Sequence, residues 1–201
     1  MRLRTQVGML AAAGVLVLTG CGGTAGDDAG QPATTAPGGD ALAASMRTAE
    51  EAGVGTVRFT EAEGGIRVEA QIDGLEPGFY GLHVHGTGLC EPDSAAPGDP
   101  AATGSFLSAG GHLGSERGEH PDHAGDLPSL YVTDSGQGAL TVLTDRFTLD
   151  ELRDEDGSAV MIHSGADNYA NIPDRYAPDG PDEDTLGTGD AGSRLACGVV
   201  E

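Results

Sequence analysis

Three histidines occupy positions where strand-like patterns bring their imidazole rings together. His83 and His85 are two residues apart in the segment F-Y-G-L-H-V-H, so both side chains point to the same face of a β-strand. His163 ends a second apolar segment, A-V-M-I-H. A buried imidazole needs partners for its ring nitrogens, and a shared metal ion satisfies several rings at once. These three residues are therefore candidate metal ligands.

The other three histidines lie in a polar stretch rich in glycine. His112 follows A-G-G, and His120, His123 and Asp126 are spaced three residues apart. A proline and a glycine within this stretch exclude a regular helix. Several imidazoles with a carboxylate suit copper or zinc, and do not suit calcium or magnesium. For His120 and His123 the alternative interpretation is a solvated loop position.

The segments that must position these residues have the pattern of antiparallel β-strands. Apolar and polar residues alternate, and glycine-rich turns separate the segments, which is typical of a sandwich or barrel. We expect strands at 57–59, 66–72, 82–85, 130–133, 139–144, 159–163 and 195–200. Residues 147–152 predict one helical turn. The stretches 86–129 and 164–193 lack a periodic pattern, and loops that long are usually functional.

Several motifs then occur in order along the chain. They are G-L-H-V-H at 81–85 with a cysteine shortly after, S-A-G-G-H at 108–112, H-A-G-D-L-P at 123–128, V-M-I-H-S-G-A-D-N at 160–168 and G-D-A-G-S-R-L-A-C-G-V-V at 189–200. From about residue 52 to its last residue, the chain resembles the bacterial copper,zinc superoxide dismutases of the exported lipoprotein type. The resemblance implies an all-β fold, an eight-stranded Greek-key β-barrel or sandwich with two long functional loops.

The resemblance also implies a role for each candidate ligand. The copper ligands would be His83, His85, His112 and His163. The zinc ligands would be His112, His120, His123 and Asp126, so that His112 bridges one copper and one zinc ion per chain. Asp167 would hydrogen-bond one ligand of each metal. The implied reaction converts superoxide to dioxygen and hydrogen peroxide by copper redox cycling, with His112 returning a proton to the reduced substrate.

A substrate channel is implied as well. Arg194 would dock the superoxide anion beside the copper, because a planar, permanently charged guanidinium orients an anion without titrating. Thr188 would narrow the channel, and Glu183 and Asp184 would be its acidic pair. The alternative for Arg194 is a structural salt bridge to one of the many acids. Gly187 stands where the family often has a lysine that guides the substrate.

Two departures from the family pattern lead to expectations of their own. Only Pro121 and Asp122 separate His120 from His123, a shorter stretch than in the family, so we expect zinc to bind but more weakly. All ten basic residues are arginine, and the chain contains no lysine. We therefore expect weak electrostatic steering of the substrate.

The N-terminal region predicts export. Arg2 and Arg4 precede an uncharged run over 7–18 that ends in L-T-G-C with Cys21, which resembles the lipobox of bacterial lipoproteins. We expect a lipoprotein signal peptide at 1–20, a flexible polar tether with lipidated Cys21 at 21–45, and the dismutase-like domain at 46–201. The lipid would anchor the exported protein in the membrane of the cell envelope. An ordinary signal peptide with an incidental cysteine is the alternative.

Two cysteines remain after Cys21. In an oxidising compartment an even pair predicts a disulfide, which would join Cys90 and Cys197. The resemblance implies the same pairing.

The charge excludes some partners. The chain has 32 acidic and ten basic residues and a formal net charge of −22, which excludes nucleic acid as a partner. Removal of residues 1–20, with two arginines and no acid, would change the charge to −24. Most of such a surface repels an anionic substrate, so attraction must be local to the metals and Arg194.

Two other functions are compatible with the ligands alone. One is an envelope lipoprotein that binds or stores copper and zinc without catalysis, and the other is a structural lipoprotein that holds only zinc. Arg194, Thr188 and Asp167 serve turnover rather than storage and favour the enzyme. The His83-x-His85 pair with His163 argues against a site for zinc alone. A homodimer is compatible with the sequence, which does not identify its contacts.

Overall fold

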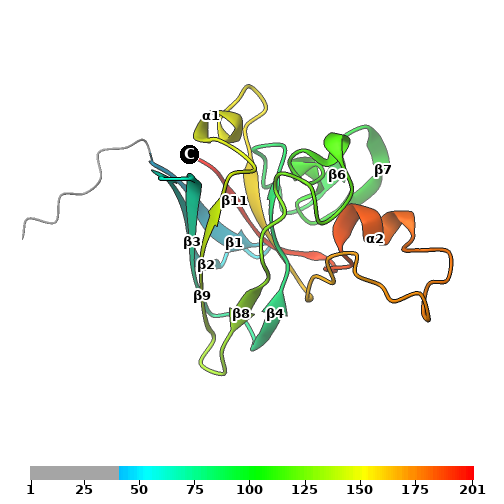
Figure 1. Ribbon diagram of the computed structural model, residues 1–201. Coiled ribbons are helices and arrows are strands. Elements are labelled where there is room, and N and C mark those ends of the chain that lie inside the picture. The colour runs from blue at the N-terminus through cyan, green and yellow to red at the C-terminus, as the bar shows by residue number, and fades with distance from the viewer. Residues whose placement is uncertain (1–40) are drawn as a thin grey trace, which may run out of the picture. The chain divides into compact units, whose positions relative to one another are not determined.

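The computed structural model describes residues 41–201 (Figure 1). The predicted signal peptide, Cys21 and the first part of the predicted tether lie outside this range. The strands are β1 (Ala41–Thr48), β2 (Gly53–Ala62), β3 (Gly65–Asp73), β4 (Gly78–Tyr80), β5 (Leu82–His85), β6 (Ser94–Ala96), β7 (Asp99–Gly104), β8 (Leu130–Val132), β9 (Gln137–Thr144), β10 (Ala159–His163) and β11 (Arg194–Val199). The helices are α1 (Leu149–Leu152), α2 (Glu183–Thr188) and two 3-10 turns, Leu107–Ala109 and Ser115–Arg117. Among residues 41–201, no helix has the length and apolar character that a membrane span requires.

Nine of the strands form one antiparallel sheet that closes almost completely. Their order is β4-β8-β9-β3-β2-β1-β11-β10-β5, and the strands at the two ends of this order are neighbours in the chain. Only Gly81 separates β4, which pairs with β8, from β5, which pairs with β10. The sheet is therefore barrel-like, and it has eight strands when β4 and β5 are taken as one interrupted strand. The all-β prediction is confirmed.

Alternation along the strands builds the interior. In β3 the side chains of Ile66, Val68, Ala70 and Ile72 are buried, whereas the residues between them are exposed or partly buried. Because successive side chains point to opposite faces, one row of each strand fills the barrel. The core is mainly aliphatic, as expected for a chain with 4% aromatic residues and no tryptophan.

The first strand begins earlier than the sequence predicts. Residues 41–45 belong to β1 and to the folded domain, so the tether predicted over 21–45 was too long. Leu42, Ala44 and Met46 alternate as buried positions, and β1 lies between β2 and β11 in the sheet. This strand has no β-branched residue before Thr48, so its own sequence carries little strand signal and pairing with its neighbours decides its structure.

The two long loops contain short elements that the pattern does not reveal. Residues 86–129 include the β6–β7 hairpin and both 3-10 turns, and residues 164–193 include α2. The predicted helical turn at 147–152 is confirmed as α1, which starts with a capping box between Thr148 and Glu151.

The predicted disulfide is present between Cys90 and Cys197, with an S–S distance of 1.99 Å. It ties the first long loop to β11, the strand that begins with Arg194. A structural disulfide indicates an oxidising compartment, which supports export of the protein.

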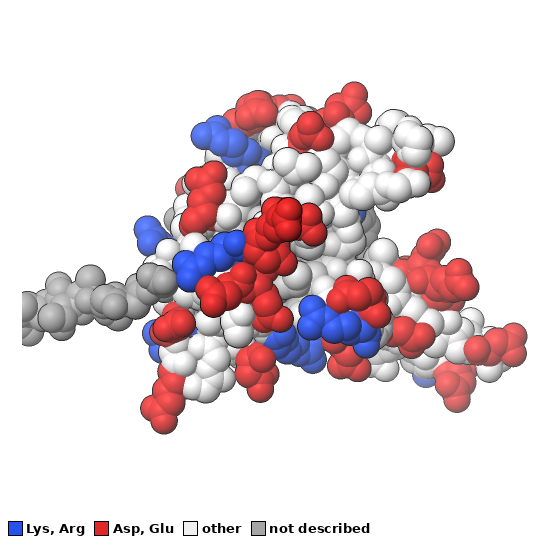
Figure 2. Space-filling model, turned by 90° about the horizontal axis from the view of Figure 1, so that it is seen from above, with Lys and Arg blue, Asp and Glu red and all other residues white. Residues whose placement is uncertain are grey.

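Acidic side chains are spread over the face shown in Figure 2, with basic ones scattered among them. This distribution agrees with the net charge of −22.

Candidate metal centre and substrate cleft

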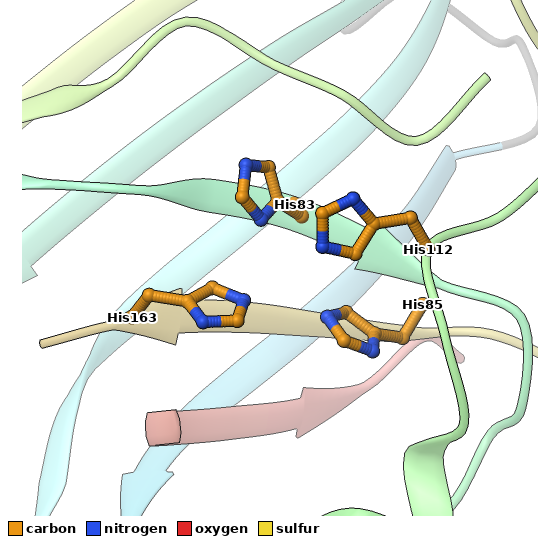
Figure 3. Close-up of side chains that lie close together, drawn as sticks. All are labelled: His83, His85, His112 and His163. Atoms are coloured by element: carbon orange, nitrogen blue, oxygen red, sulfur yellow. The ribbon is translucent and has the colours of Figure 1, made fainter. Parts of the chain in front are cut away.

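Four imidazole rings converge beside strands β5 and β10 (Figure 3). β5 supplies His83 and His85, and its neighbour β10 supplies His163. His112 comes from the first long loop and forms an isolated β-bridge with His85. Each of the four residues is at most 5% exposed. One ring nitrogen of each lies within 4.8 Å of one nitrogen of every other ring, so the four residues are able to hold one metal ion.

In three of these rings, one nitrogen forms a hydrogen bond with a carboxylate or a backbone carbonyl oxygen. His83 Nε2 lies 2.8 Å from Asp167 Oδ2, His85 Nδ1 lies 2.9 Å from the carbonyl oxygen of Gly110, and His163 Nδ1 lies 3.1 Å from that of Gly192. Because carbonyl oxygens only accept, the bonded nitrogens of His85 and His163 carry the proton, and the other nitrogen has a free lone pair. Those other nitrogens, with His83 Nδ1, are buried and have no hydrogen-bond partner. Such orphaned acceptors are expected where a metal ion binds.

A second cluster surrounds the carboxylate of Asp126. Asp126 Oδ1 lies 2.8 Å from His112 Nδ1, and Oδ2 lies 3.1 Å from His120 Nδ1 and 3.3 Å from His123 Nδ1. Four ligand atoms placed tetrahedrally about 2.0–2.1 Å from zinc are about 3.3 Å apart, so this N3O set matches a zinc site. His83 also comes within 4.8 Å of His112, His120 and Asp126, but Asp167 occupies its Nε2 and its Nδ1 belongs to the first cluster. We therefore assign His123 rather than His83 to this cluster.

Burial favours the neutral form of three rings in the first cluster, those of His85, His112 and His163. It lowers the pKa of His112 to about 4, with Asp126 opposing the shift, and lowers the pKa of His163 to about 3. It also lowers the pKa of His85 well below its usual value. Neutral imidazole is the form that binds metal ions, so these rings are ready to bind at pH 7.

His120 has the opposite electrostatic surroundings. Burial opposes its protonation, but Asp126 and Asp167 outweigh burial and raise its pKa to about 9. The same contacts with histidines hold the pKa of both carboxyl groups below their usual range, although burial acts against this. A divalent cation in the second cluster would displace the proton of His120.

Asp167 links the two clusters. Its Oδ2 contacts His83 Nε2, and its Oδ1 contacts His120 Nε2 at 2.9 Å and accepts a hydrogen bond from the backbone N–H of Tyr169 at 2.7 Å. Gly189 allows this arrangement, since a Cβ at this position would overlap Asp167 Oδ1 and lie 2.5 Å from His120 Nε2. Gly189 is a site residue that sequence reasoning did not single out, because only the folded chain brings it against His120.

A cleft of about 790 Å³ opens onto the first cluster. His85, His112, His163 and Arg194 all line it. The Arg194 guanidinium donates from Nη1 to the Phe106 carbonyl at 2.6 Å and from Nη2 to the Gly110 carbonyl at 2.5 Å. Burial lowers its pKa, but an arginine in a protein stays charged. No carboxylate pairs with this side chain among the ion pairs of residues 41–201, so the salt-bridge alternative is not what the structure shows.

Of the three other predicted channel residues, two line the same cleft. Asp184, Gly187 and Thr188 line it, and Thr188 Oγ1 donates to the Asp184 carbonyl at 2.7 Å. Glu183 is exposed and does not line the cleft. Asp190 also lines the cleft, although it was not among the channel residues predicted from the sequence.

A family model and curated relatives both point to copper/zinc superoxide dismutases as the proteins that this chain is similar to. The family model described as "Copper/zinc superoxide dismutase (SODC)" matches residues 54–200. "Superoxide dismutase [Cu-Zn]" of Mycobacterium tuberculosis (strain ATCC 25618 / H37Rv) is 45% identical over 172 residues, which cover 82% of this chain and 71% of the relative. The protein of the same name from Escherichia coli (strain K12) is 36% identical over 155 residues, which cover 74% of this chain and 79% of the relative.

Solved structures of the same kind are similar to this fold. "Cu/Zn superoxide dismutase from Brucella abortus" aligns with a TM-score of 0.61 and 32% identity, over 81% of this chain and 100% of the other. A "SOD-like protein from Bacillus subtilis" aligns with a TM-score of 0.55 and 26% identity, over 78% of this chain and 96% of the other.

Proposed function

The chain belongs to the copper/zinc superoxide dismutase family, and we propose that its two histidine clusters are the copper and zinc sites of the enzyme. The assignment of copper to the first cluster rests on one observation. Three converging rings each have a buried nitrogen without a hydrogen-bond partner: His83 Nδ1, His85 Nε2 and His163 Nε2. His112 completes a set of four imidazoles, which suits copper.

Zinc fits the second cluster. His112, His120 and His123 each present Nδ1 near the carboxylate of Asp126, which is the mixed nitrogen and oxygen set that zinc accepts. Because His112 uses Nδ1 here, its Nε2 is left for the copper cluster. His112 is thus the proposed bridge between the two sites.

The surroundings of the clusters suit superoxide chemistry. Bound copper supplies one-electron oxidation and reduction of superoxide. Arg194, held rigidly by two carbonyl oxygens, binds and orients the anion in the cleft. His112 Nε2, which the second cluster does not use, would hold a proton and pass it to the strongly basic reduced product. Thr188 limits the width of the cleft beside Arg194.

The competing proposal is a protein that stores copper and zinc. The dismutase assay separates the two, with the wild-type chain loaded with both metals and compared with His163→Ala and Arg194→Ala. We expect His163→Ala to lose activity while it keeps zinc, because His163 belongs only to the copper cluster. Arg194→Ala should lower kcat/KM by about 13- to 160-fold, which corresponds to one lost charge-assisted contact of about 1.5–3 kcal/mol. Arg58→Ala, on β2, is the control.

Two outcomes would contradict this assignment. Full activity of His163→Ala excludes copper catalysis at this cluster. An inactive wild-type protein that holds both metals favours storage.

Attachment to the envelope is a separate proposal. Cys21 at the end of L-T-G-C would receive the lipid, and the disulfide between Cys90 and Cys197 agrees with an exported domain. The Cys21→Ser variant should move from the membrane fraction to the soluble fraction of cells that express the full chain. Membrane association that survives this substitution would argue for an uncleaved signal segment or another contact.

A homodimer remains a proposal as well. Phe79 and Tyr131 are 59% and 49% exposed, and their rings are tilted by 43° with centroids 4.9 Å apart. Exposed aromatic pairs of this kind often mark an interface. Sedimentation of the wild type and of Phe79→Ser tests it, and a monomeric wild-type protein at high concentration would refute it.

A further inference from the structure

Arg146 lies outside both histidine clusters, yet its guanidinium contacts the turn between two proposed zinc ligands. Nη1 donates to the carbonyl oxygen of Pro121 at 2.6 Å and to that of His123 at 3.2 Å. Nη2 lies 3.6 Å from Asp122 Oδ1. All three contacts fall within the four residues from His120 to His123. Arg146 follows β9, so a distant part of the chain holds this turn.

The turn has little freedom to absorb a displacement. Only two residues separate His120 from His123, and both rings must reach the carboxylate of Asp126. The backbone N–H of His120 donates to the Leu186 carbonyl at 2.7 Å, which secures one end. The contacts of Arg146 secure the middle and the other end. A shift of the His123 backbone would therefore carry its ring away from the cluster.

We propose that Arg146 is a positioning residue for the zinc site, which holds the shortened turn so that His120 and His123 reach the metal together. This inference rests on the proposed assignment of zinc to the second cluster. In a longer connection the two ligands would adjust separately, whereas here one side chain orients both through their backbone. Arg146 contacts no ligand side chain in the described part of the chain, so it is not itself a ligand.

The charge of Arg146 and its contacts to the turn have opposite effects on zinc affinity. A guanidinium near the site repels a divalent cation, so loss of the charge should strengthen zinc binding if Arg146 had no other role. Loss of the contacts to the turn should weaken zinc binding. The sign of the change in zinc affinity therefore separates the two roles, and 41% exposure of the Arg146 side chain makes the charge effect the weaker of the two.

The experiment measures the zinc and copper affinities of the purified full chain by competition with chelators. In the wild type, zinc binding tests the proposed zinc site itself, and failure to bind would overturn both proposals. In Arg146→Ala we expect zinc affinity to fall by at least about tenfold, with copper affinity unchanged. Arg146→Lys keeps the charge but offers one compact ammonium, so it should recover part of the affinity. Arg58→Ala is the charge-matched control.

Cobalt in the zinc site provides the second measurement. Its visible spectrum reports tetrahedral geometry, so Arg146→Ala should show weaker or altered bands, and Arg146→Lys should restore them in part. Wild-type zinc affinity in Arg146→Ala, or an equal fall for zinc and copper, overturns the proposal. If Arg146→Ala does not fold, Arg146→Gln replaces it, because glutamine keeps one neutral donor group. Wild-type zinc affinity in this variant, or an equal fall for zinc and copper, would then overturn the proposal.

Discussion

Asp167 should control the zinc site more strongly than the copper site, although it contacts one histidine of each. His83 belongs to β5, where all four residues are buried and paired with β10. His120 belongs to a loop, and its ring is oriented by the carboxylates of Asp126 and Asp167. The sheet keeps His83 in place without Asp167. The backbone of His120 is held by the Leu186 carbonyl, but the orientation of its ring depends on the two carboxylates.

The size of the effect follows from the contacts that Asp167→Ala removes. His120 Nε2 loses a charge-assisted hydrogen bond of 2.9 Å in a buried setting, and such bonds contribute about 1.5–3 kcal/mol. Zinc affinity should therefore fall by about 13- to 160-fold. The lost negative charge acts in the same direction. Copper affinity should fall less, because strand β5 still orients His83.

Chelator competition with each metal in turn is the appropriate assay. Asp190→Ala is the matched control, because Asp190 lies in the same loop and holds Asn168 and Thr185 without contacting a histidine. An equal loss for both metals would refute the reasoning, and so would an unchanged zinc affinity or the same loss in the control.

Three further predictions follow from the same structure. Replacement of Cys90 and Cys197 by serine should lower the free energy of unfolding by up to about 4.8 kcal/mol, the chain-entropy value for a separation of 107 residues; urea unfolding without reductant checks this, and a loss below about 1 kcal/mol would contradict it. The metal-free protein should lose stability as the pH falls below about 6.5. Burial lowers the pKa of His112 and His163 to about 4 and 3, so above those values only the unfolded chain takes up these protons, at about 1.4 kcal/mol per pH unit for each; equal stability at pH 7 and pH 5 would refute this. Finally, kcat/KM should respond little to added salt, because the chain has no lysine and acidic residues share the cleft with Arg194. A steep decrease with ionic strength would show that steering is strong after all.

Much of the chemistry could be predicted because it depends on residue type and local spacing. Two histidines at positions i and i+2 on a strand must share a face, and β5 places His83 and His85 as this rule requires. Strand β3 was found from the alternation of apolar residues, and β10 was found from a continuous apolar run that ends at His163. The candidate ligands and the channel arginine were named through their motifs, and the structure brings all of these residues together around one cleft and two clusters.

Other features depend on contacts between residues far apart in the chain. Strand β1 is decided by pairing with β2 and β11, because an alanine-rich segment has little strand preference of its own. The carbonyl oxygens of Gly110 and Gly192, which select the tautomers of His85 and His163, leave no mark in the sequence, since every residue has such a carbonyl.

The sequence by itself therefore determined which side chains are available to bind metal and which strands carry them. Tertiary structure alone decided which nitrogen of each ring is free, how Asp167 joins the two clusters and why Arg146 reaches the turn at His120. The physical reason is range: alternation and spacing act over a few residues, whereas the orientation of a ring is set by hydrogen-bond partners that only the closed barrel and its loops bring near.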